Sequence, residues 1–158
     1  MGDACHHHHA VGPPGEADIE RALAVAGDRL TAEGERMTAA RTRVLELLLA
    51  AGEPVKAYDL IARFGEDGQP AKPPTVYRAL EFLERKGLAH RIASISAYVA
   101  CSTGGRDHAA AFLICDCCGA TAEVSSPVAG DLGRAADAAG YAIERTTIEA
   151  HGRCPACQ

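Results

Sequence analysis

The stretch AKPPTVYRALEFLERKGLAHR, residues 71–91, decides the fold of the first half of the chain. Its two adjacent prolines fit best in the first turn of a helix, where a missing N–H costs nothing, and Gly87 supplies the end. Apolar residues recur between them at helical spacing: Val76, Ala79, Leu80 and Leu83. We predict a helix that buries this stripe and turns Arg78, Glu81 and Arg85 outward on the opposite side.

A two-stranded hairpin is predicted directly after this helix. Residues 88–93 and 97–101 are short apolar or alternating runs, and residues 94–96 between them suit a turn. Upstream, three segments have the apolar periodicity of helices: 18–30, a run that Thr38 caps and that ends near Gly52, and 57–64. The first of these segments is a leader helix, and the other two together with the helix that begins at Pro73 make three helices followed by a hairpin, which is the arrangement of a winged helix.

The outward face of the helix that begins at Pro73 is a candidate surface for DNA. Most helices have a charged, solvated face, but the position just before the hairpin is that of a recognition helix. Arg78 could donate to guanine O6 and N7, and Tyr77 could contact a thymine methyl group or a phosphate. Tyr58 could contact DNA or only cap the core. The candidate DNA-binding residues are Tyr58, Lys72, Thr75, Tyr77 and Arg78, with Arg41, Arg43, Lys56 and Arg91 as further candidate phosphate contacts.

The negative net charge of the chain argues only weakly against binding to nucleic acid. The 158 residues carry a formal net charge of −5, but the front half of the chain is neutral with basic clusters and the back half is acidic. The amino-terminal segment lacks the apolar core of a secretory signal, and the apolar runs are too short to cross a bilayer. We therefore expect a cytoplasmic protein whose seven cysteines bind metal or serve redox chemistry rather than form a disulfide framework.

The chain is predicted to divide into two small domains of the α+β class. The expected parts are a disordered tail at 1–16, a winged-helix DNA-binding domain at 17–101, a hinge at 102–108 and a metal-binding domain at 109–158. In the second domain we expect strands at 110–115, 121–124 and 141–149, with a helix between Pro127 and Ala139. The tract from Cys5 to His9 fits either an engineered tag or a native metal-scavenging segment.

Two CxxC motifs are the strongest local signal of chemistry. Residues 115–119 read CDCCG and residues 154–157 read CPAC, and two such motifs can present four thiolates tetrahedrally to one zinc ion. Two chance pairs of buried cysteines would be unusual in so short a chain, and a redox CxxC motif would need a thioredoxin-like βαβ context. The zinc ligands that we assign are Cys115, Cys118, Cys154 and Cys157. Cys117 could replace a neighbour in a CxC register, but Gly119 directly after Cys118 suits the tight turn better, so we leave Cys117 outside the site.

A second group of possible metal ligands, with a weaker sequence signal, lies on both sides of the predicted domain boundary: His90, Cys101, His108 and Glu123. Nitrogen, sulfur and oxygen ligands from both domains would make metal binding a clamp on the hinge, and metal occupancy could then become a conformational signal. By spacing alone this signal is weak, because a lone histidine is more often a surface residue or a satisfied core residue.

Four stretches of the sequence resemble one family of regulators. The words AYDL at 57–60, the stretch 71–91, FLICDCCGATAEV at 112–124 and IEAHGRCPAC at 148–157 resemble the zinc-uptake branch of the ferric uptake regulator (Fur) superfamily, and the match spans about 18–157. The PPTVYR segment and the paired CxxC motifs are specific to the superfamily. The IEAHG ending and Cys101 point to the zinc branch.

The resemblance implies a homodimer with an amino-terminal winged helix and a carboxy-terminal dimerisation domain, which represses zinc-uptake genes when zinc is plentiful. It implies two zinc ions per subunit, a structural ion on the four motif cysteines and a sensing ion on His90, Cys101, His108 and Glu123. The family's base-contacting Tyr and Arg fall on Tyr58 and Arg78. Its histidine-rich stretch is thinned here to Arg106-Asp107-His108, which puts in doubt a third metal site to which His151 could contribute.

Other functions fit the sequence less well. An iron or peroxide sensor on the same scaffold is the nearest alternative, and Cys101 argues against it because a thiolate favours zinc over a hard iron site. A zinc enzyme is not expected, because the chain has neither an HxE…PCxxC nor an HExxH signature. A structural zinc-ribbon adaptor would explain the four motif cysteines but not the TVYRAL helix with its hairpin.

Overall fold

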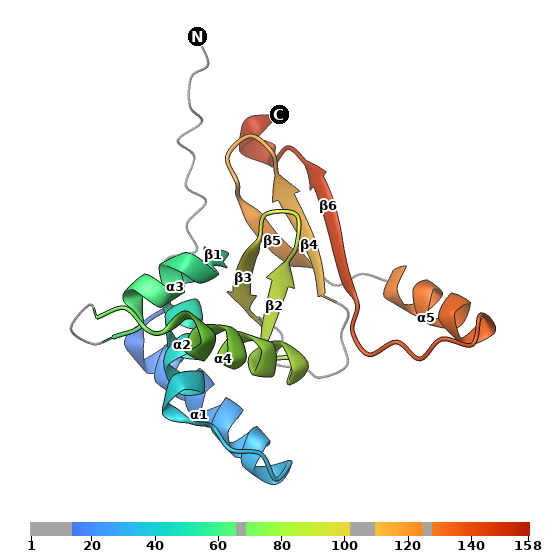
Figure 1. Ribbon diagram of the computed structural model, residues 1–158. Coiled ribbons are helices and arrows are strands. Elements are labelled where there is room, and N and C mark those ends of the chain that lie inside the picture. Colours follow the sequence, from blue (N-terminus) through green and yellow to red (C-terminus); the bar gives the residue numbers. More distant parts are fainter. Residues whose placement is uncertain (1–13, 66–68, 102–109, 125–127) are drawn as a thin grey trace. The chain divides into compact units, whose positions relative to one another are not determined.

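The computed structural model describes residues 14–65, 69–101, 110–124 and 128–158. These residues form two compact units, the first within residues 14–101 and the second within residues 110–158, and each is described by itself (Figure 1). Helices and small sheets occur in both units, which confirms the predicted α+β class. None of the helices in the described ranges has both the length and the hydropathy that a membrane crossing requires.

Four helices make up most of the first unit: α1 (Glu16–Ala32), α2 (Ala39–Ala51), α3 (Ala57–Arg63) and α4 (Pro73–Arg85). As predicted, the hydroxyl of Thr38 caps α2 by accepting a hydrogen bond from the backbone N–H of Arg41, and α2 ends at Gly52, whose φ is 61°. Pro73 and Pro74 open α4, as the sequence indicates. Local chemistry therefore sets the ends of both helices.

A three-stranded antiparallel sheet, here called the wing, completes the first unit: β1 (Val55–Lys56), β2 (Ala89–Ile92) and β3 (Ala97–Ala100), in the order β1-β3-β2. The hairpin of β2 and β3 is the predicted one, and Ser96 in its turn has a φ of 52°. Strand β1 is not predicted by any pattern in the sequence. Two residues are too few to show an alternating pattern, and Val55 and Lys56 become a strand only by pairing with Tyr98 and Ala97.

The core of the first unit combines one apolar stripe from each helix. The four residues predicted to face inward from α4, Val76, Ala79, Leu80 and Leu83, are each at most 3% exposed. They pack in one cluster with residues from the other elements: Ala26, Leu30, Val44, Leu45, Leu48, Val55, Leu60 and Leu88. Burial of this stripe leaves the opposite side of α4 to solvent.

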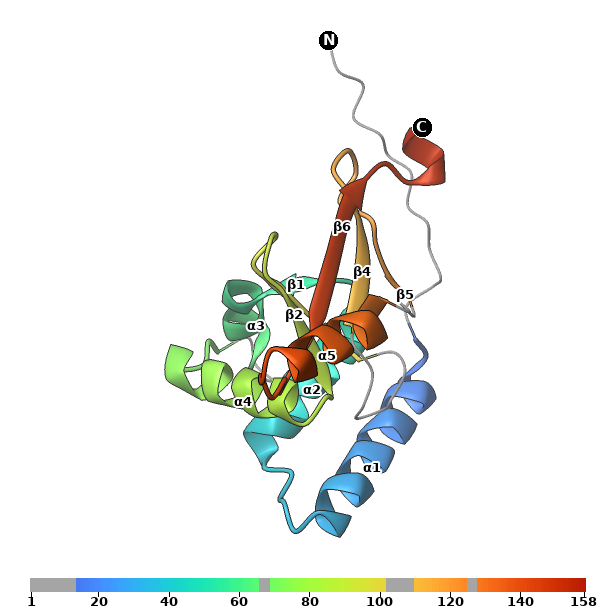
Figure 2. The same ribbon diagram turned by 90° about the vertical axis from the view of Figure 1, so that its right-hand side faces the viewer.

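The second unit is a three-stranded sheet with one helix and a short 3-10 turn. Its elements are β4 (Ala110–Cys115), β5 (Thr121–Val124), α5 (Val128–Ala138), β6 (Thr147–Gly152) and η1 (Pro155–Cys157). The strand order is β5-β4-β6, with β5 antiparallel and β6 parallel to β4. Figures 1 and 2 both show β6 running alongside β4.

The strand predicted at 141–149 is wrong in its first half. Residues 141–146 are irregular, and the strand instead extends to Gly152. The reason is the length of the partner: β4 has six residues, and their register pairs Ala110 with Thr147 and Cys115 with Gly152. Residues before Thr147 therefore have no β4 residue to pair with, whatever their intrinsic preference for a strand.

Candidate metal centre and nucleic-acid interface

Two turns at one edge of the second unit bring four cysteines together. Cys115 ends β4 and pairs with Gly152 at the end of β6, so the parallel strands deliver both CxxC segments to the same edge. The sulfur atoms of Cys115, Cys118, Cys154 and Cys157 all lie within 4.8 Å of one another. We call this set the cysteine cluster. It consists of the four residues that the motif spacing selected.

The geometry of the cysteine cluster fits a tetrahedrally coordinated metal ion. At a zinc–sulfur distance of about 2.3 Å, the sulfur atoms of a tetrahedral site are about 3.8 Å apart. The Sγ atoms of Cys118 and Cys154 are 3.7 Å apart. Cys118 and Cys154 are half-buried and Cys115 is buried, as expected for a closed structural site rather than an open catalytic one.

Backbone N–H groups lower the pKa of one of these thiols. The N–H of Cys154 donates to Cys115 Sγ at 3.3 Å, and together with the N–H of Cys118 it lowers the pKa of Cys115 to about 6. Burial and the neighbouring thiols raise the pKa of Cys157. Because only the thiolate binds metal, the lowered pKa of Cys115 favours the binding form at neutral pH, whereas the raised pKa of Cys157 disfavours it.

The turn that carries Cys118 is fixed by its neighbours. Gly119 has a φ of 76°, which favours glycine, and its N–H donates to the carbonyl of Cys115 at 2.9 Å. His151 Nδ1 lies 2.8 Å from the carboxylate of Asp116 and links β6 to the same turn. Cys117 is exposed and is not among the four clustered thiols.

His90 and Cys101 lie on the same face of the wing. His90 is opposite Val99 in the β2–β3 register, and Cys101 follows Val99 by two residues, so its side chain points to the same side. The N–H of Cys101 donates to the carbonyl of Leu88 at 3.0 Å and extends the pairing beyond β3. Glu123 lies on β5 of the second unit, opposite Phe112. His108 lies outside the described residues.

The outer side of α4 has the character predicted for a DNA-reading surface. Arg78, Glu81 and Arg85 are exposed, and so are Thr75 in the first turn and Lys72 at the N-cap. Tyr77 is 51% exposed, and Tyr58 on α3 is 77% exposed. Both tyrosines are therefore accessible to a partner.

Two arginines considered for phosphate binding make contacts within the fold. Arg43 donates to the carbonyls of Phe64 and Arg63 and pairs with Glu46 at 2.9 Å, so it ties α2 to the end of α3. The guanidinium of Arg41 lies 3.3 Å from the centre of the Phe82 ring. Sequence periodicity could not assign these roles, because the partners lie on other elements.

A winged helix joined to a unit with a four-thiolate cluster defines the class: a DNA-binding protein with a metal-binding domain. The model of the ferric uptake regulator family matches residues 32–151. The chain belongs to this family. Its members are regulators, so the activity is regulatory rather than enzymatic.

The chain is similar to several named proteins of this family. The chain is 40% identical over 124 residues to the zinc uptake regulation protein of Escherichia coli (strain K12), covering 77% of this chain and 72% of that protein. It is 29% identical over 134 residues to the ferric uptake regulation protein of Synechococcus elongatus, covering 82% of this chain and 90% of that protein. A solved zinc uptake regulator in complex with zinc and DNA matches with a TM-score of 0.78 and 38% identity, covering 88% of this chain and 94% of that one.

Proposed function

We propose that the protein is a zinc-responsive transcriptional repressor, which binds operator DNA as a zinc-loaded homodimer and represses zinc-uptake genes. The observation that carries the proposal is the similarity, in sequence and in fold, to a regulator solved with zinc and DNA. The alternative of an iron or peroxide sensor is not favoured, since identity is 40% to the zinc regulator and 29% to the ferric one. A DNA-binding repressor of this kind acts in the cytoplasm, where the chromosome is.

The cysteine cluster would hold a structural zinc ion. Four thiolates are the ligand set of closed zinc sites, and the 3.7 Å between two of the sulfur atoms fits that geometry. A bound zinc ion would supply a positive charge that offsets the repulsion among four clustered thiolates and would link the segments at the ends of β4 and β6. In this role the metal contributes to folding rather than to sensing.

A second zinc ion would be the regulatory one, bound by His90, Cys101, His108 and Glu123. The shared face of His90 and Cys101 on the wing supports two of these ligands, and the family resemblance supports all four. His90 and Cys101 belong to the domain proposed at 17–101, whereas His108 and Glu123 lie at or beyond the hinge proposed at 102–108. Ligands from both domains would restrict the hinge and favour arrangements in which both winged helices of a dimer fit DNA.

The DNA contacts that we propose come from α3 and α4. Arg78 would read guanine, and Tyr58 would contact a base beside it. Tyr77, Thr75 and Lys72 at the amino-terminal end of α4 would contact bases or phosphates, because a recognition helix presents this end to the major groove. A symmetric dimer would place two such helices about one helical turn of DNA apart or a multiple of it.

Exposed apolar side chains on the second unit support the homodimer. Among the residues that the structure describes in a single copy of this unit, six large apolar side chains are at least 37% exposed: Leu113, Val124, Val128, Leu132, Tyr141 and Ile143. Surfaces of this kind are typical of subunit interfaces. The second unit would therefore serve for dimerisation as well as for metal binding.

The test is a titration of operator binding against buffered free zinc, with the parent and Cys101→Ser. We expect operator affinity to rise steeply with zinc in the parent and to stay low in Cys101→Ser. Cys117→Ser is the matched control, because it makes the same chemical change at an exposed cysteine outside both proposed ligand sets. Binding that is indifferent to zinc, or that follows iron, would contradict the proposal.

A further inference from the structure

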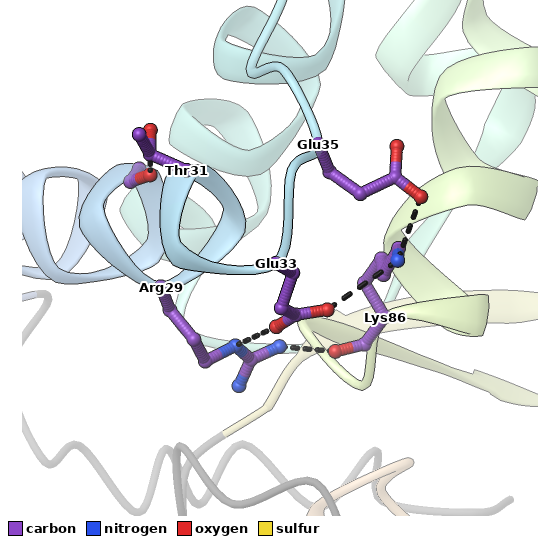
Figure 3. Close-up of polar contacts among 6 residues, drawn as sticks. Arg29, Thr31, Glu33, Glu35 and Lys86 are labelled. Carbon is purple, nitrogen blue, oxygen red and sulfur yellow. Dashed lines mark hydrogen bonds and ion pairs between the residues drawn. The ribbon is translucent and has the colours of Figure 1, made fainter.

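A network of charged side chains joins α1 to the end of α4. Lys86, the C-cap residue of α4, places its Nζ 2.7 Å from Glu35 and 3.3 Å from Glu33. Arg29, in the last turn of α1, lies 3.6 Å from the same Glu33 and donates to the backbone carbonyl of Lys86. Figure 3 shows the four side chains linked in one chain of contacts. Arg29, Glu33 and Lys86 are no more than 17% exposed.

The contact between Arg29 and Lys86 acts as a cap from another helix. The last carbonyls of a helix lack partners inside the helix and carry partial negative charge, so a guanidinium donor there satisfies both needs. Arg29 lies 57 residues before Lys86 in the chain, which makes this cap a tertiary contact. It fixes the end of α4 to α1 through a hydrogen bond, which is directional, whereas the apolar packing beneath α4 is not.

The two ends of α4 are held differently. The network holds the carboxy-terminal end, and the amino-terminal end carries exposed Thr75, Tyr77 and Arg78. A helix of this length spans about 20 Å, so a tilt of about 10° at the fixed end would move the first turn by about 3 Å. Such a displacement exceeds the tolerance of a hydrogen bond to a base edge.

We propose that Arg29, Glu33, Glu35 and Lys86 form a positioning network that sets the tilt of α4 and thereby the specificity of operator recognition. The inference rests on the proposed function for its DNA-binding part. The four residues contact no DNA in this role. They are positioning residues that act through α4, and zinc binding does not depend on them.

The test compares Arg29→Met with Arg21→Met in the zinc-loaded, full-length protein. Both changes remove one guanidinium from α1, but Arg21 pairs with Asp18 on the same helix, at 3.1 Å, and is 72% exposed. We expect Arg29→Met to lower operator affinity about tenfold, the equivalent of one weakened base contact, with little change for a scrambled duplex, whose binding depends on phosphate charge. Arg21→Met should leave the ratio of the two affinities unchanged.

A second measurement does not need DNA. Residual dipolar couplings of the amides in α2 and α4 report the angle between these helices, and we expect a change in Arg29→Met but not in Arg21→Met. An unchanged angle, or an unchanged ratio of operator to scrambled affinity, overturns the proposal even if the variant is less stable. If the angle changes in Arg29→Met but the parent shows no zinc-dependent operator binding, the proposed function is contradicted, whereas the effect of the network on the tilt of α4 is not. If Arg29→Met does not fold, Glu35→Gln removes one partner of Lys86 and is expected to act in the same direction.

Discussion

At the scale of single residues, Cys115 and Cys118 show how a local turn prepares side chains for metal. The backbone N–H of Cys154 on the other segment, together with that of Cys118 in the turn, lowers the pKa of Cys115 to about 6. Cys118 completes the turn and lies 3.7 Å from Cys154 on the other segment. Cys115 and Cys118 therefore both contact the other CxxC segment.

Removing one of these thiols should empty the proposed structural site. In Cys118→Ser we expect the zinc content of the purified protein to fall and the second unit to lose its cooperative thermal transition, since structural zinc contributes on the order of 10 kcal/mol to the folding of small zinc domains, which is comparable to the whole stability of a domain. Metal analysis and calorimetry measure the two effects. Cys117→Ser should retain the parent values, and equal losses in both variants would contradict the assignment.

The ion pair of Glu35 and Lys86 predicts that the stability of the folded protein depends on pH. The hydrogen bond from Lys86 lowers the pKa of Glu35 below its ordinary value of 4.5. A depressed carboxyl pKa contributes stability that is present above the pKa of the unfolded chain and is lost as the pH falls through the folded value. The pKa of Lys86 is raised above 10.5 by its bond to Glu35, so its contribution is present at neutral pH and is lost only in strong alkali.

Urea unfolding of the parent and of Glu35→Gln tests this dependence. The difference in free energy of unfolding should be constant around pH 7 and should shrink toward zero as the pH falls through the lowered folded pKa of Glu35, below which the carboxyl is protonated in both states. Asp18→Asn is a useful reference, because its ion pair with Arg21 is exposed and should contribute little at any pH. A difference that persists unchanged in acid would show that Glu35 acts by packing alone.

At the scale of elements, we expect replacement of two glycines by alanine to change the free energy of unfolding in opposite directions. Gly52 ends α2 with a φ of 61°, a conformation that side chains rarely adopt, so Gly52→Ala should lower the free energy of unfolding by about 1 kcal/mol. Gly27 lies inside α1, and a Cβ there would meet no atom within 4 Å, so Gly27→Ala should raise it by about 0.5 kcal/mol. Chemical denaturation of both variants gives the comparison. Two effects of the same sign would contradict it.

The sequence predicts elements well where short-range chemistry decides them. Thr38, Gly52 and the two prolines mark helix ends by hydrogen bonding and dihedral preference, and the spacing of four cysteines indicates the cysteine cluster. Strand β1 and the limits of β6 depend on pairing with residues far along the chain, so no local pattern could predict them. The same holds for Arg29, whose role depends on a carbonyl 57 residues away.

At the scale of the whole molecule, the proposed dimer makes the second unit a condition for DNA binding by the first. Leu132 on α5 is 46% exposed, and Leu132→Asp would place a charge in the proposed interface. We expect the dissociation constant of the dimer to rise at least about tenfold, measured by sedimentation, with a parallel loss of operator affinity. Val25→Asp, at a 63% exposed apolar position in the first unit, is the matched control. A variant that remains dimeric would place the interface elsewhere.

The parallel pairing of β4 with β6 has a consequence for biosynthesis. The hairpin of β4 and β5 can form as soon as residue 124 has left the ribosome, but β6 and the second CxxC segment arrive only about thirty residues later. The cysteine cluster therefore cannot assemble until Cys157 has emerged, and a nascent chain exposes Cys115 and Cys118 before their partners exist. Metal loading is consequently a late event in the synthesis of the second unit.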